Sequence, residues 1–241
     1  MTSSVLLFDG YIPGDEALKN SHWIAERTHD RLGGDAALLT HPNAVRKSLE
    51  TSLADPEYQG LVLFGHGDPG RLHAALRVQH KENASGALDD ASEAGAVYGC
   101  DEQPALDLDN LHLLRDRWCH ALACNIGLSL AHRAVGSGTC CFVAYQTSLT
   151  PEYEVDSLPV PLRSLLESVV TSTTYHLHAG IREEITLKAK VQEAIEALEI
   201  WLEDKDGLCW IEAQEGFMQV AGLRGLVRQL RRDMVVVVAE R

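Results

Sequence analysis

Residues 61–67 have the sequence Leu-Val-Leu-Phe-Gly-His-Gly, an apolar run that ends abruptly at glycine and histidine. Short runs of bulky or β-branched residues that stop at glycine are typical of buried strands. Similar runs occupy residues 5–8, 36–39, 118–123 and 140–145. Because helix-like stretches separate most of these runs, the sequence predicts an α/β fold with a mostly parallel central sheet.

The stretches between and after these runs predict the remaining elements. Helices are expected at residues 15–32, 106–115, 126–135, 160–170, 181–203 and 222–232, and late strands at 207–211 and 234–239. The helix at 181–203 is expected to place one stripe of apolar residues toward the core, namely Ile181, Ile185, Ile195, Leu198 and Leu202. Asn43 is expected to cap a further helix that places Leu49 and Leu53 on one side. Residues 79–104 lack periodicity, so we expect an insertion loop there. With no long linker, one domain is expected over residues 1–241.

Composition and cysteine spacing limit the classes of function. The 241 residues include 35 acidic residues against 21 Lys and Arg, a formal net charge of −14. Nucleic-acid binding by general phosphate neutralisation needs a broadly basic face, so that class is excluded, and docking on anionic membranes is disfavoured. No apolar run approaches the ~20 residues of a membrane span, and no basic leader is present. The six cysteines form no paired framework and no CxxC motif, so we expect a cytoplasmic protein with free thiols, no metal and no cofactor.

Two of the predicted strands end in residues that can do chemistry. His66 follows the run at residues 61–64, and Cys124 follows the run at residues 118–123. The carboxyl ends of parallel strands line a common crevice, so we expect these two side chains to face each other. A free thiol has a pKa of about 8.5, and a nearby imidazole that takes its proton yields the reactive thiolate. The same imidazole can then protonate a leaving amine.

The residues beside this pair suit the same chemistry. Acyl transfer needs N–H donors aimed at the developing oxyanion, and Gly67 lets its backbone N–H approach a substrate carbonyl closely. The Cys124 backbone N–H is the natural second donor. If a helix begins at Asn125, its dipole favours the thiolate. Asp68 and Asn125 are the candidate substrate-binding residues, although Asp68 precedes Pro-Gly, and Asp-Pro-Gly is more typical of a plain turn.

The other histidines and cysteines are weaker candidates for a catalytic base or nucleophile. A lone cysteine is usually a small buried hydrophobe, and most structural thiols are inert. We therefore expect no catalytic role for Cys119, Cys140, Cys141 and Cys209. His112 and His120 are rival bases. His120 has the same strand parity as Cys124, but an extended chain would place the two about 13 Å apart.

An apolar strand that ends in His-Gly, followed roughly 50–60 residues later by a strand that ends in a small residue and Cys, resembles the caspase-like (clan CD) cysteine peptidases. Within that group the CHAT-domain proteases are the most similar. The resemblance implies a three-layer sandwich, with His66 as general base or acid, Cys124 as nucleophile and Gly67 as an oxyanion donor. The chain departs from the caspase signature Gln-Ala-Cys-x-Gly, because residues 122–127 are Leu-Ala-Cys-Asn-Ile-Gly. Cleavage after aspartate therefore does not follow.

The expected function is a thiol endopeptidase that cleaves a protein partner through an acyl-enzyme intermediate. Relatives of this kind act in prokaryotic antiviral (antiphage) defence and cut a partner such as a gasdermin, so a defence effector is one expected substrate. An activating partner protein is a further expectation, and residues 79–104 would either gate the site or be clipped themselves. Two alternatives remain open, namely a catalytically silent scaffold of the same fold and another thiol acyl hydrolase.

Overall fold

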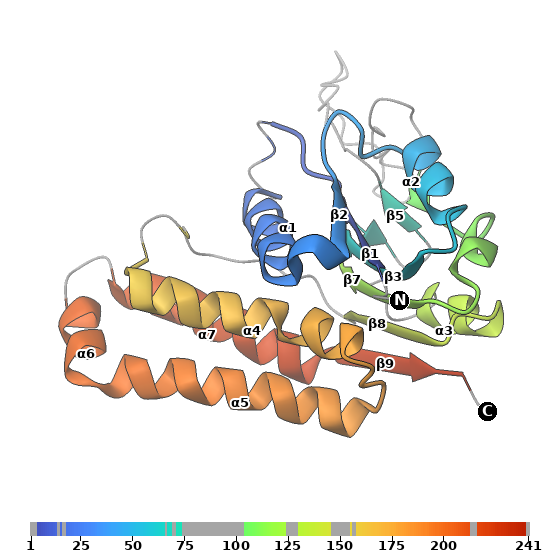
Figure 1. The fold of residues 1–241 in the computed structure, drawn as a ribbon. Helices are drawn as coiled ribbons and strands as arrows, with labels where there is room; N and C mark the ends of the chain where they lie inside the picture. Colours follow the sequence, from blue (N-terminus) through green and yellow to red (C-terminus); the bar gives the residue numbers. More distant parts are fainter. Residues whose placement is uncertain are drawn as a thin grey trace, which may run out of the picture.

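A six-stranded sheet with the strand order β2-β1-β3-β7-β8-β9 lies at the centre of the protein (Figure 1). The computed structural model describes residues 4–13, 15, 18–65, 67–68, 71–73, 104–123, 130–145, 155, 158–212 and 216–239. The strands of this sheet are β1 (Ser4–Asp9), β2 (Ala36–Leu39), β3 (Tyr58–Phe64), β7 (Trp118–Leu122), β8 (Cys141–Tyr145) and β9 (Met234–Val238). Neighbouring strands run parallel, except that β9 is antiparallel to β8. The prediction of an α/β fold with a mostly parallel sheet is confirmed.

Helices and a second, smaller sheet complete the described part of the chain. The helices are α1 (Lys19–Leu32), α2 (Arg46–Leu53), α3 (Leu130–Gly136), α4 (Val160–His178), α5 (Glu184–Glu203), α6 (Lys205–Glu212) and α7 (Gly216–Arg232), with 3-10 turns η1 (Gly33–Asp35) and η2 (Leu111–Leu114). The small antiparallel sheet has the order β4-β5-β6, formed by β4 (Gly67–Asp68), β5 (Arg71–His73) and β6 (Pro104–Leu106). Among the residues described, no helix is both long and apolar enough to cross a membrane.

Helices cover both faces of the central sheet and so create three layers. Along β1, Leu7 contributes to a core shared with α1, α4, α5 and α7, whereas Leu6 contributes to a core shared with α2, η2 and α3. Both side chains are buried. A sheet buried on both faces favours apolar residues at nearly every position, and this explains why its strands are near-continuous apolar runs rather than alternating ones. Each such buried side chain stabilises the fold by about 1.5–3 kcal/mol.

The strand order reverses direction at β1. The chain passes from β1 to β2 on one side, and then returns to place β3 on the other side of β1. In open α/β sheets, ligands bind outside the carboxyl ends of the strands at such a reversal. The carboxyl ends of β1 and β3 are therefore the expected place for a functional site.

Two sequence predictions were wrong in the part of the chain that follows α4. Residues 207–211, predicted as a strand, belong to helix α6. The Asp204 carboxylate accepts hydrogen bonds from the backbone N–H groups of Asp206 and Gly207, both at 2.9 Å, which is an N-cap arrangement that starts a helix. Ile185, expected on the buried stripe of α5, is 85% exposed, because the stripe instead follows Leu187, Val191, Ile195, Leu198 and Leu202.

Three further corrections concern residues 43–115. The N-cap of α2 is Val45, whose backbone is extended, and not Asn43. Pro104, the last residue of the predicted insertion loop, belongs to β6, and residues 79–103 lie outside the described residues. The helix predicted at residues 106–115 is only the short turn η2. Its first part is not helical because the Asn110 side chain accepts the backbone N–H of Asp107, at 2.9 Å, and so competes with a helical turn.

Candidate functional site

The predicted site residues are described only in part. His66, Cys124 and Asn125 lie outside the described residues. Gly67 and Asp68 form β4, where they pair with Leu72 and Arg71 of β5. The described backbone therefore reaches the site from both sides of His66 and, along β7, up to Ala123. Pro69 and Gly70, which would complete the predicted turn, lie outside the described residues.

The strands that lead to the predicted base and nucleophile are direct neighbours. β3 and β7 run parallel, and Phe64 is the register partner of Leu122. His66 follows Phe64 by two residues, and Cys124 follows Leu122 by two residues. Neighbouring strands lie about 4.8 Å apart, so β3 and β7 end side by side at the same edge of the sheet. Phe64 and Leu122 also belong to the same core, on the face that α1 and α4 cover.

A buried carboxylate lies at the end of the next strand. Asp9 is the register partner of Phe64, and the following residue, Gly10, donates its backbone N–H to the Phe64 carbonyl at 2.8 Å. The Asp9 side chain is 1% exposed, and its Oδ2 lies 2.5 Å from Nδ1 of His22 on α1. Burial raises the pKa of Asp9, while the contact with His22 opposes that rise. The Tyr11 ring stacks on the His22 ring, with 4.5 Å between ring centroids.

Sequence reasoning missed this Asp9–His22 pair. A carboxylate that directly follows an apolar strand was the available signal, since parallel strands end at a common edge. Its partner could not be found in the same way, because His22 lies in the polar part of a predicted helix. Asp9, Phe64 and Leu122 lie in one row across three neighbouring strands. The Asp9–His22 pair therefore places titratable groups at the same edge of the sheet as the ends of β3 and β7.

The rival bases are less suited to the chemistry. His120 is fully buried, with Nδ1 2.8 Å from the Thr174 hydroxyl and Nε2 3.2 Å from the Tyr145 hydroxyl. Burial lowers the pKa of His120 to about 3, so the imidazole is neutral and both its nitrogens are engaged. His112 is exposed on η2, and its Nδ1 lies 3.2 Å from the backbone carbonyl of Asp109.

The described cysteines are free thiols in contrasting environments. Cys119 and Cys141 are buried as expected, and burial raises the pKa of both, that of Cys141 to about 12. Neither forms thiolate readily near neutral pH. Cys140 is half-buried, and Cys209 is exposed on α6, so the expectation of a buried thiol is wrong for Cys209.

In the described part of the chain, no group of three or more His, Cys, Asp or Glu side chains could hold a metal ion. No protein-family model matches the chain, and a search of curated proteins finds no match.

Proposed function

We propose that the protein is a caspase-like cysteine endopeptidase of the CHAT type, with Cys124 as the nucleophile and His66 as the general base and acid. The main support is the register of β3 with β7. His66 and Cys124 each follow, by two residues, one member of the Phe64–Leu122 pair on neighbouring parallel strands. A nucleophile and its base must come within hydrogen-bond reach of each other, and equal offsets from paired residues favour that approach.

The proposed reaction proceeds through an acyl-enzyme. His66 takes the Cys124 thiol proton, and the thiolate sulfur forms a bond to the carbonyl carbon of the peptide. The backbone N–H groups of Gly67 and Cys124 donate to the oxygen that becomes negative. His66 then gives its proton to the amine as the carbon–nitrogen bond breaks. Water, deprotonated by His66, hydrolyses the thioester to release the acid and restore the thiol.

The resemblance found in the sequence supports the choice of substrate and setting. We infer a protein substrate in the cytoplasm, such as a gasdermin-like defence effector, and an activating partner. The low thiolate content of buried cysteines supports Cys124 over Cys119 and Cys141, since burial raises the pKa of both of these thiols.

Alkylation by iodoacetamide, mapped by mass spectrometry, tests the proposal. Cys124 should react about tenfold faster than Cys209, which provides the rate of an exposed thiol on the same chain. The variant Cys124→Ala should lose the fast site, and His66→Ala should slow alkylation of Cys124 about tenfold, to the rate of an ordinary thiol. The matched variant Cys209→Ser should keep the fast alkylation of Cys124. Equal rates at Cys124 and Cys209 would show that the thiol is not activated and would favour the silent scaffold.

Cleavage itself needs a second measurement. A peptide library and a candidate protein substrate should be cut by the wild type and left intact by Cys124→Ala, with circular dichroism confirming that the variant is folded. Fast alkylation of Cys124 together with an uncut library and substrate would overturn the endopeptidase assignment. That outcome would favour another thiol acyl hydrolase.

A further inference from the structure

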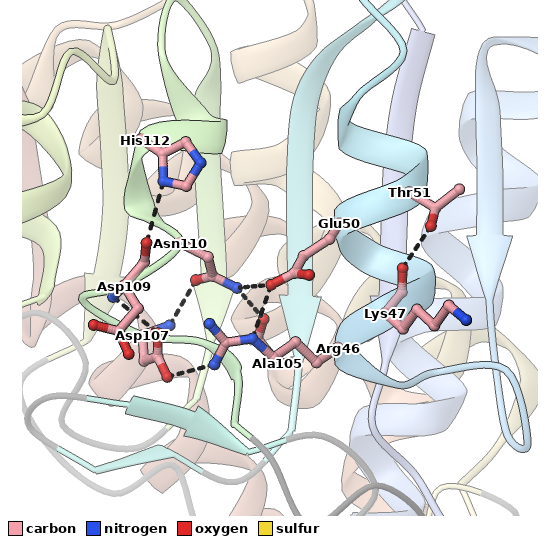
Figure 2. Close-up of polar contacts among 9 residues, drawn as sticks. All are labelled: Arg46, Lys47, Glu50, Thr51, Ala105, Asp107, Asp109, Asn110 and His112. Carbon is pink, nitrogen blue, oxygen red and sulfur yellow. Dashed lines mark hydrogen bonds and ion pairs between the residues drawn. The ribbon is translucent and has the colours of Figure 1, made fainter.

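A network of polar side chains joins α2 to the end of β6 (Figure 2). Arg46, the first residue of α2, donates from Nε to Oε1 of Glu50 at 2.8 Å and from Nη1 to Oδ2 of Asp107 at 2.7 Å. Asp107 directly follows β6. Arg46 and Asp107 are 18% and 15% exposed, so this ion pair is largely shielded from water. Hydrogen bonds between charged groups are stronger than neutral ones and fix geometry well.

Asn110 also forms hydrogen bonds with the segment around the end of β6. Its Nδ2 donates to the Ala105 carbonyl at 2.9 Å and to Oε1 of Glu50 at 3.3 Å, while its Oδ1 accepts the Asp107 backbone N–H at 2.9 Å. Asn110 is 2% exposed. The residues on both sides of Leu106 are therefore held by one side chain, and that side chain also contacts α2. These contacts fix the end of β6 to helix α2.

The small sheet connects this anchored end to the residue that follows His66. Leu72 of β5 is the register partner of Leu106 on β6 and also of Gly67 on β4. Gly67, Leu72 and Leu106 thus form one line across the sheet, and Asp107 is the residue directly after that line. β4 has two residues and β5 has three. Strands this short have little stability of their own, so the place of β4 depends on β3, which ends three residues before it, and on its pairing through β5 with β6.

We propose that the Arg46–Asp107 ion pair is a positioning pair for the Gly67 backbone N–H. The inference rests on the proposed function, in which that N–H donates to the oxyanion. An oxyanion donor must be held within about 0.5 Å of its productive place, and the loss of one donor lowers the rate of acyl transfer about 10²–10³-fold. Partial misplacement by a remote change costs up to about a hundredfold. Arg46 and Asp107 do not touch the substrate in this role.

The test separates acyl transfer from simple thiol reactivity. Alkylation of Cys124 by iodoacetamide needs the thiolate but forms no oxyanion. Acylation by p-nitrophenyl acetate does form one, and it is measured as the part of p-nitrophenolate release that Cys124→Ala abolishes. In Asp107→Asn and Arg46→Lys, the ratio of acylation rate to alkylation rate should fall about tenfold to a hundredfold. Arg46→Lys keeps the charge but cannot bond Glu50 and Asp107 with the same fork of donors.

Glu199→Gln provides the matched control. Glu199 on α5 pairs with Arg224 on α7 at 2.6 Å, and the variant removes the charge from a comparable ion pair that is not connected to the small sheet. Its ratio should equal that of the wild type. An unchanged ratio in Asp107→Asn and Arg46→Lys, or a parallel fall of alkylation and acylation, would overturn the inference while the proposed function stands. A wild type whose Cys124 is neither alkylated rapidly nor acylated would overturn the proposed function itself.

Discussion

His120 shows how burial of one residue makes stability depend on pH. Burial lowers its pKa to about 3 in the folded protein, against about 6.5 in an unfolded chain. Between these values the unfolded chain binds a proton that the folded protein excludes, so the stability linked to His120 is complete above pH 6.5 and is lost as the pH falls. The free energy of unfolding should therefore drop by about 2 kcal/mol between pH 6.5 and pH 5, and His120→Gln should remove this drop.

Urea unfolding at the two pH values measures this effect. The control is His112→Gln, which alters an exposed histidine and should follow the wild type. An acid loss of the same size in His120→Gln and in the wild type would mean that other groups cause it.

The environment of His120 could not be predicted from the sequence, although its position in a strand could. Its bonding partner Thr174 lies on α4, beyond residue 170, where a helix was predicted to end. The run Thr171-Ser-Thr-Thr174 lacks the apolar period that marks a helix, yet all four residues are buried. Their hydroxyl groups are accommodated by contacts such as the one from Arg31 to Thr171, at 2.5 Å. Partners so far apart in sequence leave no local signal.

At the scale of elements, the strands of the central sheet were the most predictable feature. β1, β2, β3, β7, β8 and β9 all overlap predicted runs, because the strands of a mostly parallel sheet covered by helices are near-continuous apolar runs. The elements that were wrong depend on side-chain hydrogen bonds. Asp204 starts α6 and Asn110 prevents a longer helix before η2, and neither effect produces hydrophobic periodicity.

The pairing of β3 with β7 depends on a close contact between a glycine and a ring. Gly60 is the register partner of Trp118, and a Cβ added to Gly60 would come within 2.2 Å of the Trp118 ring. The ring is 3% exposed and has the Arg182 guanidinium over it, 5.7 Å from the ring centroid, so it cannot move away freely. Gly60→Ala should lower the free energy of unfolding by about 1–3 kcal/mol, measured by urea denaturation.

Two further variants make this prediction specific. Gly34→Ala, at a site where an added Cβ meets nothing within 4 Å, should change stability much less. In the background Trp118→Leu, the additional cost of Gly60→Ala should shrink, because the ring that causes the clash is gone. Equal costs in both backgrounds would contradict the steric explanation.

At the scale of the whole molecule, the fold class followed from the sequence but the order of the strands did not. Alternating strand and helix patterns indicate a parallel sheet whichever strands are neighbours. The position of β1 between β2 and β3 results from contacts between distant residues, such as Asp9 with Phe64. For the candidate site too, one part could be predicted from the sequence and another part could not. His66 and Cys124 were identified by their place after apolar runs, whereas the adjacency of β3 and β7 needed the structure.

The helices α4, α5 and α7 extend side by side beyond the sheet, with α6 at their far end, yet they should unfold together with the sheet (Figure 1). Their buried residues form one core with those of the strands, in which Val62 and Trp118 pack in the same cluster as Leu162 of α4. Two variants with tryptophans in one region only test this expectation of one domain. The first keeps Trp118 in the sheet and has Phe in place of the other tryptophans. The second keeps only Trp201 and Trp210 at the helical end, whose ring centroids are 6.3 Å apart. In urea, both fluorescence transitions and the far-ultraviolet circular dichroism should share one midpoint once corrected for each variant's own stability, because a shared core makes unfolding cooperative. If the fluorescence of Trp201 and Trp210 changed at a lower urea concentration than the circular dichroism of the same variant, while Trp118 fluorescence did not precede the dichroism of its own variant, the chain would contain two units instead of one.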